Sequence, residues 1–476
     1  KQMTRCCMTW RNGLIAVAII YFILAFMCLM YLPNFDSLLI DSDKADSKDH
    51  HKPRHRHILV REWLKQRCEN VSSARPADVV TSYPLTGSVG IRNQQQQPPL
   101  RVMSAYYDAR KELSHYIRVL TILPRSAKST VNLHCHVPLA PGLHFTVPGT
   151  PYEMNENHAM PYGAYVFSCA LPPHLQVSDP ICSVLITDGP EPIRDLDGRP
   201  VSSVELPVLT VPREIPTNAL PTASAISPRQ FTVCVPPLFG SPSDRKLLDF
   251  VEMSRALGAE HFVFYLTDEI YSNNGVLLKL LTSYASRGLA TLFHWKPVNE
   301  FRSQIHYHGQ VLAVHHCLYW NMGLSKYAVF QDFDELLVPN SAKYKSWTDL
   351  AKDIDDGTHC GFRFFSAFFE PDQSYFDAKR TAGVSRVRTK CMVKPDLIFE
   401  MGIHHISKQN IEEMTPENKE PDVALLHHYS RCTMAFDNGA GDLCSKYIAD
   451  TELHFWRKQF EKFKLETVHA LNSSSR

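Results

Sequence analysis

The sequence has no excess of charge of either sign. Its 476 residues include 50 Lys and Arg and 49 Asp and Glu, which gives a formal net charge of +1. Because no overall positive charge attracts a polyanion, nucleic-acid binding would need a local basic patch, and none stands out. Hydrophobic residues make up 44% of the chain and charged residues 21%, proportions that exclude an intrinsically disordered protein. We therefore expect a globular protein with no nucleic-acid partner.

Cysteine pairs spaced as C-x-x-C are also absent, so the sequence does not indicate a structural zinc site. Of the 13 cysteines, Cys6, Cys7 and Cys28 precede residue 33 and ten follow it. An even number of cysteines is typical of a protein folded in an oxidising compartment, which predicts several disulfide bonds. Two N-x-[ST] sequons, at Asn70 and Asn472, add a weak indication of a glycoprotein.

One long apolar run lies near the N-terminus. Residues 14–32 contain no charged side chain, and as a helix they would span roughly 28 Å, close to the hydrocarbon thickness of a bilayer. The run ends without the small-x-small site of a cleaved signal peptide, so we expect an uncleaved transmembrane anchor. Basic residues precede the run and acidic residues follow it, which predicts a cytoplasmic tail at 1–13 and a lumenal remainder.

Two segments of different character follow the expected anchor. Residues 33–100 combine mixed charges, a His/Arg cluster and a Gln-rich tract, a composition that predicts a stem or linker rather than a packed domain. Residues 101–228 contain short apolar runs separated by Pro and Gly, which is typical of a β-rich, sandwich-like domain. Neither segment contains a pattern that indicates catalysis.

The third segment, residues 229–476, alternates predicted strands with amphipathic helices. Such alternation predicts βαβ crossovers and a largely parallel sheet, an α/β fold. Ligands of these sheets bind beyond the carboxyl ends of the strands. The predicted strands lie at 231–235, 261–266, 289–293 and 327–330.

An acidic turn comes directly after the fourth predicted strand. Asp332 and Asp334 flank Phe333, and carboxylates at positions i and i+2 can face one side of a turn and hold a hard divalent cation. A solvated acidic turn is the simpler explanation for an isolated D-x-D pair. The position of this pair at a strand end favours a cation that would neutralise a diphosphate.

Six ordered segments of the third region stand out together. They are Val233–Gly240 (VCVPPLFG), Tyr307–Gln310 (YHGQ), Phe330–Pro339 (FQDFDELLVP), Thr389–Pro395 (TKCMVKP), Phe399–His405 (FEMGIHH) and His428–Tyr429 (HY). Together these segments resemble glycosyltransferase family 92. The resemblance implies a GT-A fold, which is Rossmann-like, and an inverting mechanism. It also implies Mn²⁺, a UDP-sugar donor (UDP-galactose in characterised members) and residence in the Golgi membrane.

The resemblance implies a metal site built on the acidic turn. Asp334 would bind the metal directly, and Asp332 would reach the metal or the ribose. A neutral imidazole would be a further ligand, and His404 and His428 are the first candidates. The neighbouring His405 and His427 remain alternatives.

The nucleotide would then lie at the ends of the neighbouring strands. Pro237, in the loop after the first strand, and Asp268, after the second, would face the uridine. His308 and Gln310 open a helix whose N-terminus could face the diphosphate. Lys390 would add positive charge beside the leaving group.

An inverting transfer needs a carboxylate that takes the proton of the acceptor hydroxyl while the metal stabilises the leaving UDP. Glu400 is the first candidate for this base, and Asp372 and Glu370 are its rivals. Glu400 could equally orient a metal ligand.

We therefore expect a single-pass type II protein of the Golgi membrane with a lumenal catalytic domain. It would transfer galactose from UDP-galactose to a glycan acceptor on glycoproteins or glycolipids. Two alternatives stay open: a transferase that uses another UDP-sugar, and a non-catalytic lumenal carbohydrate-binding or scaffold protein with the same fold.

Overall fold

The structure is a computed structural model that describes most of the motif-bearing part of the chain. The described residues are 79–80, 83–84, 101–111, 114–128, 131–140, 143–172, 181–190, 203–209, 229–240, 242–273, 275–295, 301, 304–433 and 443–473. The predicted tail and membrane anchor lie outside them, as does the predicted stem except for two short strands. No helix within these ranges is long and apolar enough to span a bilayer.

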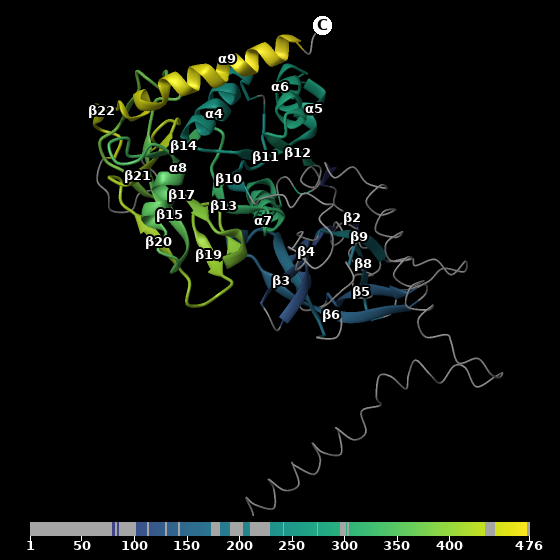
Figure 1. Cartoon of the computed structure of the whole chain (residues 1–476). Helices are drawn as coiled ribbons and strands as arrows, with labels where there is room; N and C mark the ends of the chain where they lie inside the picture. The colour runs from purple at the N-terminus through teal and green to yellow at the C-terminus, as the bar shows by residue number, and fades with distance from the viewer. Residues whose placement is uncertain are drawn as a thin grey trace, which may run out of the picture. The chain divides into compact units, whose positions relative to one another are not determined.

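Seven strands in the first half of the chain close into a barrel, drawn in blue in Figure 1. They pair in the order β3-β4-β7-β6-β5-β8-β9, and β9 also pairs with β3. The predicted β-rich region is confirmed, but the sandwich of two separate sheets is wrong, because the parallel β3–β9 pairing joins the two ends of the sheet. The strands are β3 (Arg101–Lys111), β4 (Ser114–Pro124), β5 (Leu133–Ala140), β6 (Leu143–Glu153), β7 (Tyr162–Leu171), β8 (Ser183–Asp188) and β9 (Ser203–Leu209), with β2 (Tyr83–Pro84) beside β3.

The barrel has its own apolar core. Ile117 and Val119 on β4, like Val184 and Ile186 on β8, are fully buried and belong to one cluster. Alternate residues of a strand point to the same face, which explains why the two buried residues on each strand are two positions apart. A disulfide bond between Cys135 of β5 and Cys169 of β7 lies in the same cluster.

The second half of the chain forms a larger mixed sheet. Its strand order is β1-β12-β11-β10-β13-β17-β15-β21-β14, with β20 beside β15. The run from β1 to β13 is parallel, which confirms the predicted parallel sheet. The strands are β1 (Val79–Val80), β10 (Arg229–Cys234), β11 (His261–Leu266), β12 (Ala290–Trp295), β13 (Ser325–Phe330), β14 (Glu335–Pro339), β15 (His359–Phe368), β17 (Ser385–Val393), β20 (Thr415–Lys419) and β21 (Ala424–His428).

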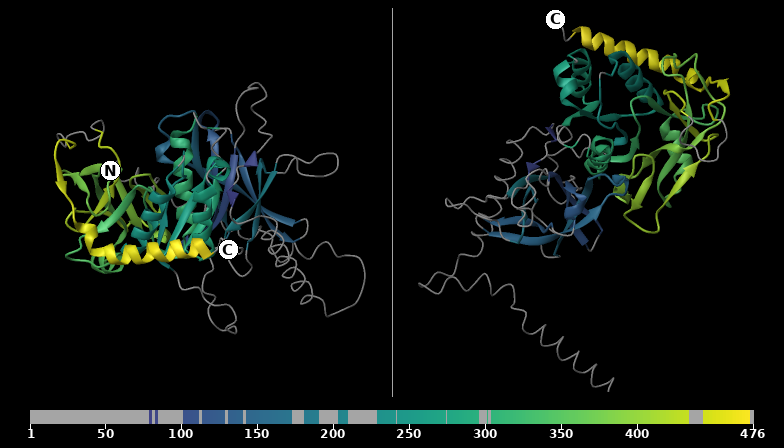
Figure 2. Two further views of the ribbon diagram at one scale, coloured as in Figure 1. Left: turned by 90° about the horizontal axis from the view of Figure 1, so that it is seen from above. Right: turned by 180° about the vertical axis from the view of Figure 1, so that it is seen from behind.

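Helices cover this sheet and create two buried cores. On α4, Ser243 caps the N-terminus by accepting a hydrogen bond from the Lys246 amide, and Leu247 and Phe250 are buried. The C-terminal helix α9 packs on α4 and α6, as both views of Figure 2 show in yellow. The helices are α4 (Asp244–Leu257), α5 (Asp268–Asn273), α6 (Gly275–Ser286), α7 (Gln310–Trp320), α8 (Trp347–Ile354) and α9 (Arg457–Ser473).

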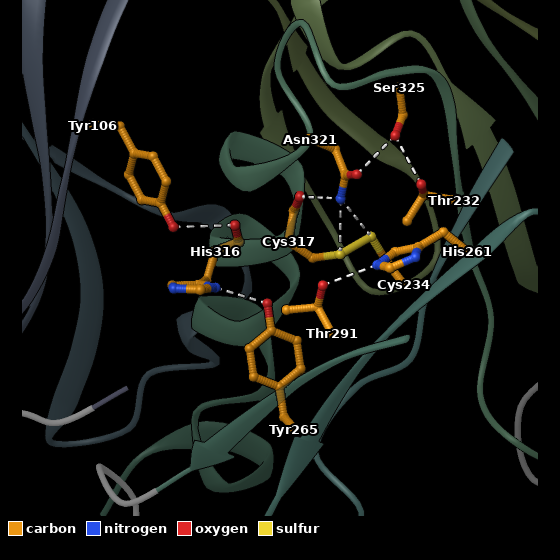
Figure 3. The surroundings of a disulfide bond; sticks show 10 residues. All are labelled: Tyr106, Thr232, Cys234, His261, Tyr265, Thr291, His316, Cys317, Asn321 and Ser325. Carbon is orange, nitrogen blue, oxygen red and sulfur yellow. Dashed lines mark hydrogen bonds between the residues drawn. A yellow bond between two sulfur atoms is a disulfide. The ribbon is translucent and has the colours of Figure 1, made fainter. Parts of the chain in front are cut away.

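The second core joins the larger sheet to the barrel through α7. A disulfide bond links Cys234 at the end of β10 to Cys317 of α7 (Figure 3). On the other side of α7, the Tyr106 hydroxyl from the barrel donates a hydrogen bond to the His316 carbonyl at 3.2 Å. The His316 ring in turn lies 2.8 Å from the Tyr265 hydroxyl of β11. Residues of the barrel, α7 and the larger sheet therefore share one apolar cluster.

The predicted disulfide bonds are confirmed in the described part of the chain. Besides the two bonds above, Cys432 and Cys444 are joined near the C-terminus. Cys360 and Cys391 are buried free thiols.

Candidate active site

The acidic turn lies at the carboxyl end of β13, between that strand and β14. Asp332 follows the strand by two residues, and its backbone amide donates a hydrogen bond of 2.9 Å to Oε2 of Glu335. Glu335 is the first residue of β14 and is 1% exposed. The turn therefore carries three carboxylates, of which the sequence analysis assigned roles only to Asp332 and Asp334.

A buried lysine neutralises part of this acidic cluster. Nζ of Lys390, on β17, lies 3.0 Å from Oδ2 of Asp332 and 3.3 Å from Oε2 of Glu335. Burial alone would lower the pKa of Lys390, but the two carboxylates raise it above its usual value. Burial alone would raise the pKa of Asp332, and the charge of Lys390 lowers it instead. The structure thus brings Lys390 to the acidic turn, and its role beside the leaving group stays a prediction.

The other two carboxyl groups hold protons more tightly than usual. Burial and the nearby charge of Glu335 raise the pKa of Asp334 to about 6. Burial raises the pKa of Glu335 to about 7, although Lys390 acts in the opposite direction. Three carboxyl groups with one lysine leave an excess of negative charge once all three ionise, which is the condition that attracts a cation.

Two of the candidate histidines face this cluster. On β21, His428 is opposite Glu335 in the strand register. Its Nε2 lies 3.8 Å from Oδ2 of Asp334, and its Nδ1 lies 3.7 Å from Oε1 of Glu335. Burial lowers the pKa of His428, so the ring is neutral at pH 7, the form that can bind a metal.

His404 is neutral because it is buried, and its backbone partner fixes which ring nitrogen carries the proton. Its Nδ1 lies 3.0 Å from the Thr389 carbonyl, and because a carbonyl only accepts, Nδ1 carries the proton and Nε2 keeps its lone pair. Burial and the charge of Lys390 lower the pKa of His404 to about 4. Metal-binding histidines commonly donate their second ring N–H to a carbonyl in this way.

The two alternative histidines lie elsewhere. The ring of His427 stacks on Phe369 with centroids 4.3 Å apart. His405 points to Glu156 of the barrel, with 3.6 Å between Nδ1 and Oε1. Their contacts indicate packing and domain contact.

Unsatisfied buried atoms in the cluster are compatible with a bound cation. Oδ1 of Asp332 and Nδ1 of His428 are buried and have no hydrogen-bond partner among the described residues, and such atoms are costly unless a ligand or water satisfies them. Within the same ranges, no three His, Cys, Asp or Glu side chains form a ready-made metal site. The chain therefore gathers candidate ligands without arranging them in a complete coordination shell.

The predicted nucleotide-binding residues lie along the neighbouring strand ends. Pro237 follows β10, and the next residue, Leu238, bridges to Leu266 at the end of β11. Asp268 opens α5, and its Oδ1 lies 2.5 Å from Nε2 of His294. Pro237 and Asp268 therefore follow two neighbouring strands, β10 and β11, at the same edge of the sheet, as the parallel sheet predicts.

A strained turn directly precedes α7. Tyr307 and His308 have φ values of 44° and 56°, a left-handed conformation that is unfavourable for non-glycine residues. The Nδ1 atom of His308 is buried without a partner in the described structure, and its ring lies 4.9 Å from that of Phe239. Gln310 is the first residue of α7 and is buried. Strain of this kind is often stored at ligand sites.

The three candidate bases occupy different surroundings. Glu400 is 1% exposed and accepts hydrogen bonds from the Tyr152 hydroxyl at 2.6 Å and from Asn155. The Asp372 side chain is 86% exposed and lies 3.0 Å from Nζ of Lys246. No hydrogen bond or ion pair between described residues joins Glu400, Asp372 or Glu370 to the acidic turn, so the identity of the base stays a prediction.

Sequence reasoning missed the contributions of Glu335 and of the barrel residues Tyr152, Asn155 and Glu156. Glu335 could have been found from its place in the D-F-D-E run, three residues after Asp332, at the start of a buried strand. No local signal marks the barrel residues, because their partners lie more than 240 positions away in sequence.

Parallel strands with an acidic turn at their carboxyl ends define an α/β protein whose ligand site lies at the strand ends. The profile of glycosyltransferase family 92 matches residues 229–473, and the chain belongs to this family. Over 294 residues the chain is 27% identical to a Caenorhabditis elegans protein named beta-1,4-galactosyltransferase galt-1. That match spans 58% of this chain and 63% of the length of the relative.

Proposed function

We propose that the protein is an inverting glycosyltransferase with a GT-A catalytic domain that uses Mn²⁺ and transfers galactose from UDP-galactose to a glycan. Family membership supports glycosyl transfer, and the printed name of the worm relative supports galactose as the sugar. The observation that carries the proposal is the partly buried cluster of Asp332, Asp334 and His428, in which Oδ1 of Asp332 and Nδ1 of His428 have no hydrogen-bond partner among the described residues.

A divalent cation would be held by Asp334 and His428, with Asp332 and His404 facing it. When bound, the cation would supply Lewis-acid stabilisation of the negative charge that develops on the departing diphosphate. Lys390 keeps Asp332 ionised through the 3.0 Å ion pair. The N-terminus of α7, which begins at Gln310, favours negative charge at the diphosphate position.

The loop after β15 is the best location for the base. Its first residue, Phe369, donates a backbone hydrogen bond of 2.8 Å to the carbonyl of His428. Glu370 and Asp372 come shortly after Phe369 in the chain, so the loop that carries them begins beside a candidate metal ligand. The exposure of Asp372 allows an acceptor hydroxyl to approach. We assign proton acceptance to Asp372, with Glu370 as its rival. The oxygens of Glu400 are already engaged by Tyr152 and Asn155.

The activity test is UDP release from a panel of UDP-sugars by the full chain with Mn²⁺ and a mixed glycan acceptor. UDP-galactose should give the largest rate. Asp334→Asn should lower that rate by roughly 100-fold or more, because a metal ligand that stabilises the transition state is lost. Asp422→Asn is the matched control, because Asp422 pairs with Lys343 at the surface. Glycan binding without UDP release from any sugar would instead indicate a carbohydrate-binding protein.

The proposed location is the Golgi membrane, with a single N-terminal anchor and a lumenal catalytic domain. The uncharged run at 14–32 and the charge difference across it carry this part of the proposal. Protease added to intact microsomes should spare the C-terminal region, and its digestion would contradict the topology.

A further inference from the structure

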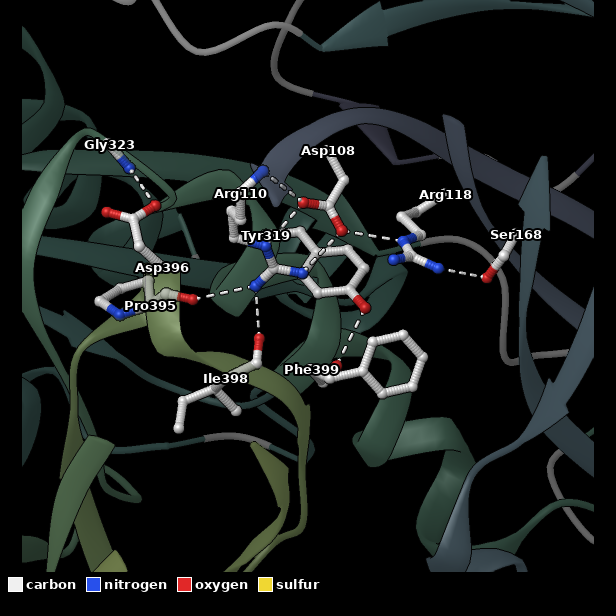
Figure 4. A network of polar contacts seen from close by, with 10 residues as sticks. All are labelled: Asp108, Arg110, Arg118, Ser168, Tyr319, Gly323, Pro395, Asp396, Ile398 and Phe399. Atoms are coloured by element: carbon white, nitrogen blue, oxygen red, sulfur yellow. Dashed lines mark hydrogen bonds and ion pairs between the residues drawn. The ribbon is translucent and has the colours of Figure 1, made fainter. Parts of the chain in front are cut away.

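The barrel holds one short segment of the larger domain at several points. Nη1 of Arg110, on β3, donates to the Pro395 carbonyl at 3.1 Å and to the Ile398 carbonyl at 2.5 Å (Figure 4). Nε of the same guanidinium is fixed by Asp108 at 2.7 Å. Arg118 holds the second oxygen of Asp108 at 2.8 Å. This buried network therefore fixes the beginning of the segment.

A second group of barrel residues fixes the middle and the end of the segment. Oε2 of Glu400 accepts from the Tyr152 hydroxyl at 2.6 Å and from Nδ2 of Asn155 at 2.9 Å. Oε1 of Glu400 accepts from the Asn155 backbone amide at 2.6 Å. Three residues later, the Ile403 amide donates to Oε2 of Glu156 at 2.8 Å. The barrel thus contacts the segment 395–403 by both backbone and side chain.

The next residue along the chain is a candidate metal ligand. His404 is tied to Thr389 twice, because its Nδ1 donates to the Thr389 carbonyl and its own carbonyl accepts from the Thr389 hydroxyl. Thr389 directly precedes Lys390, which pairs with Asp332. A continuous set of bonds therefore leads from the barrel to the acidic turn through His404.

The surroundings of Glu400 are those of an orienting group. The carboxylate is almost fully buried, and hydrogen bonds from Tyr152 and Asn155 engage both of its oxygens, so neither is free to accept a proton from an acceptor hydroxyl. Buried polar networks whose groups are all satisfied rigidify a structure and select one arrangement. The shared apolar cluster already joins the barrel to the larger sheet, so attachment does not require these polar contacts.

We propose that the barrel is a positioning element of the catalytic centre, acting through Tyr152, Asn155 and Glu400 on the placement of His404. Glu400 is then a positioning residue and not the general base. This inference rests on the proposed function, since it assumes that His404 faces a bound cation.

The test measures Mn²⁺ binding by electron paramagnetic resonance, together with kcat and KM, on the full chain. Glu400→Gln should weaken Mn²⁺ binding about tenfold, at the lower limit of the 10–100-fold range typical for direct partners of metal ligands, because Glu400 acts on His404 only through the segment between them. Tyr152→Phe, which removes one of the hydrogen bonds, should weaken it roughly threefold, less than the loss of a whole partner. In the double variant the two losses should not multiply, because both act through one contact.

Tyr344→Phe is the matched control. The Tyr344 hydroxyl donates to Oδ2 of Asp353 at 2.6 Å, so the substitution breaks the same kind of bond away from the segment. Its Mn²⁺ affinity should equal that of the unsubstituted chain. Circular dichroism of each variant establishes that it is folded, and Tyr152→Phe keeps the test decisive if Glu400→Gln does not fold.

Two results would overturn the inference. A lower kcat in Glu400→Gln with unchanged Mn²⁺ affinity, and no effect of Tyr152→Phe, would identify Glu400 as the base. Mn²⁺ affinity equal to that of the control in all variants would show a purely structural contact. Absence of both Mn²⁺ binding and UDP release in the unsubstituted chain would overturn the proposed function as well, so the two failures can be distinguished.

Discussion

Replacement of Asp108 by asparagine tests the buried ion-pair network of Figure 4. Asp108 is 3% exposed, and its two oxygens lie 2.7 Å from Nε of Arg110 and 2.8 Å from Nε of Arg118. Burial alone would raise the pKa of Asp108, but the two guanidinium groups hold it well below its usual range. The carboxylate is therefore charged at pH 7, and the substitution removes one negative charge.

The expected cost is large because two cations lose their shared counter-charge. Removing one partner of a buried ion pair typically destabilises a protein by about 3–5 kcal/mol, since the remaining charge stays buried without compensation. The Arg110 and Arg118 side chains are 6% and 8% exposed, so water cannot replace the lost carboxylate. We expect Asp108→Asn to fall in this range.

Glu153→Gln is the matched control, because Glu153 also pairs with two cations. Its partners Arg125 and Lys128 are 38% and 48% exposed, and exposed ion pairs typically contribute only about 0.2–1 kcal/mol. The assay is urea unfolding of the full chain at pH 7, monitored by circular dichroism and repeated at low and at high salt concentration. Salt should reduce the small effect at Glu153 more than the effect at Asp108. Equal losses in the two variants would refute the reasoning.

Two further predictions concern pH and disulfide bonds. Burial lowers the pKa of His316 to about 3. Below pH 6.5 the unfolded chain therefore binds a proton at this position that the folded chain does not bind. The free energy of unfolding consequently decreases as the pH is lowered. Between pH 7 and pH 5 this histidine should account for a loss of about 2 kcal/mol in the free energy of unfolding. The urea midpoint of His316→Gln should therefore depend less on pH than that of the unsubstituted chain. An unchanged dependence would contradict the assignment. Removing the Cys234–Cys317 bond, whose cysteines are 83 residues apart, should lower the free energy of unfolding by about 4–5 kcal/mol. Removing the Cys432–Cys444 bond, whose cysteines are 12 residues apart, should lower it by about 3 kcal/mol. Urea midpoints of the paired alanine variants check this order, and a reversed order would contradict the loop-entropy argument.

The parallel sheet and the acidic turn could be predicted because their signals are local. Each parallel strand is a short apolar run, such as Phe231–Cys234 within β10, and all residues of β11 are buried. A strand buried on both faces has no polar alternation, so the run itself is the signal. Asp332 and Asp334 follow the last such run directly, which fixes their place at the carboxyl edge of the sheet.

The barrel closure and the surroundings of Glu400 could not be predicted, because they depend on contacts between distant residues. Ala105 of β3 pairs with Val208 of β9, and neither strand differs in composition from a strand of a sandwich. Glu400 lies in a segment that resembles the family, which made it a candidate base. Its hydrogen-bond donors Tyr152 and Asn155 come from a region that contains no family motif.

The shared core shows why the barrel and the family-matched region depend on each other. The family match begins at residue 229, yet the cluster around α7 includes Leu120 and Ile122 of the barrel together with Val311 and Leu318 of the helix. Each fully buried apolar side chain of this size contributes about 1.5–3 kcal/mol relative to exposure. The family-matched region without the barrel would expose this face of α7, and it would also lose the donors that hold Glu400. The same strands therefore complete the hydrophobic core and fix the segment that leads to the candidate metal ligand His404.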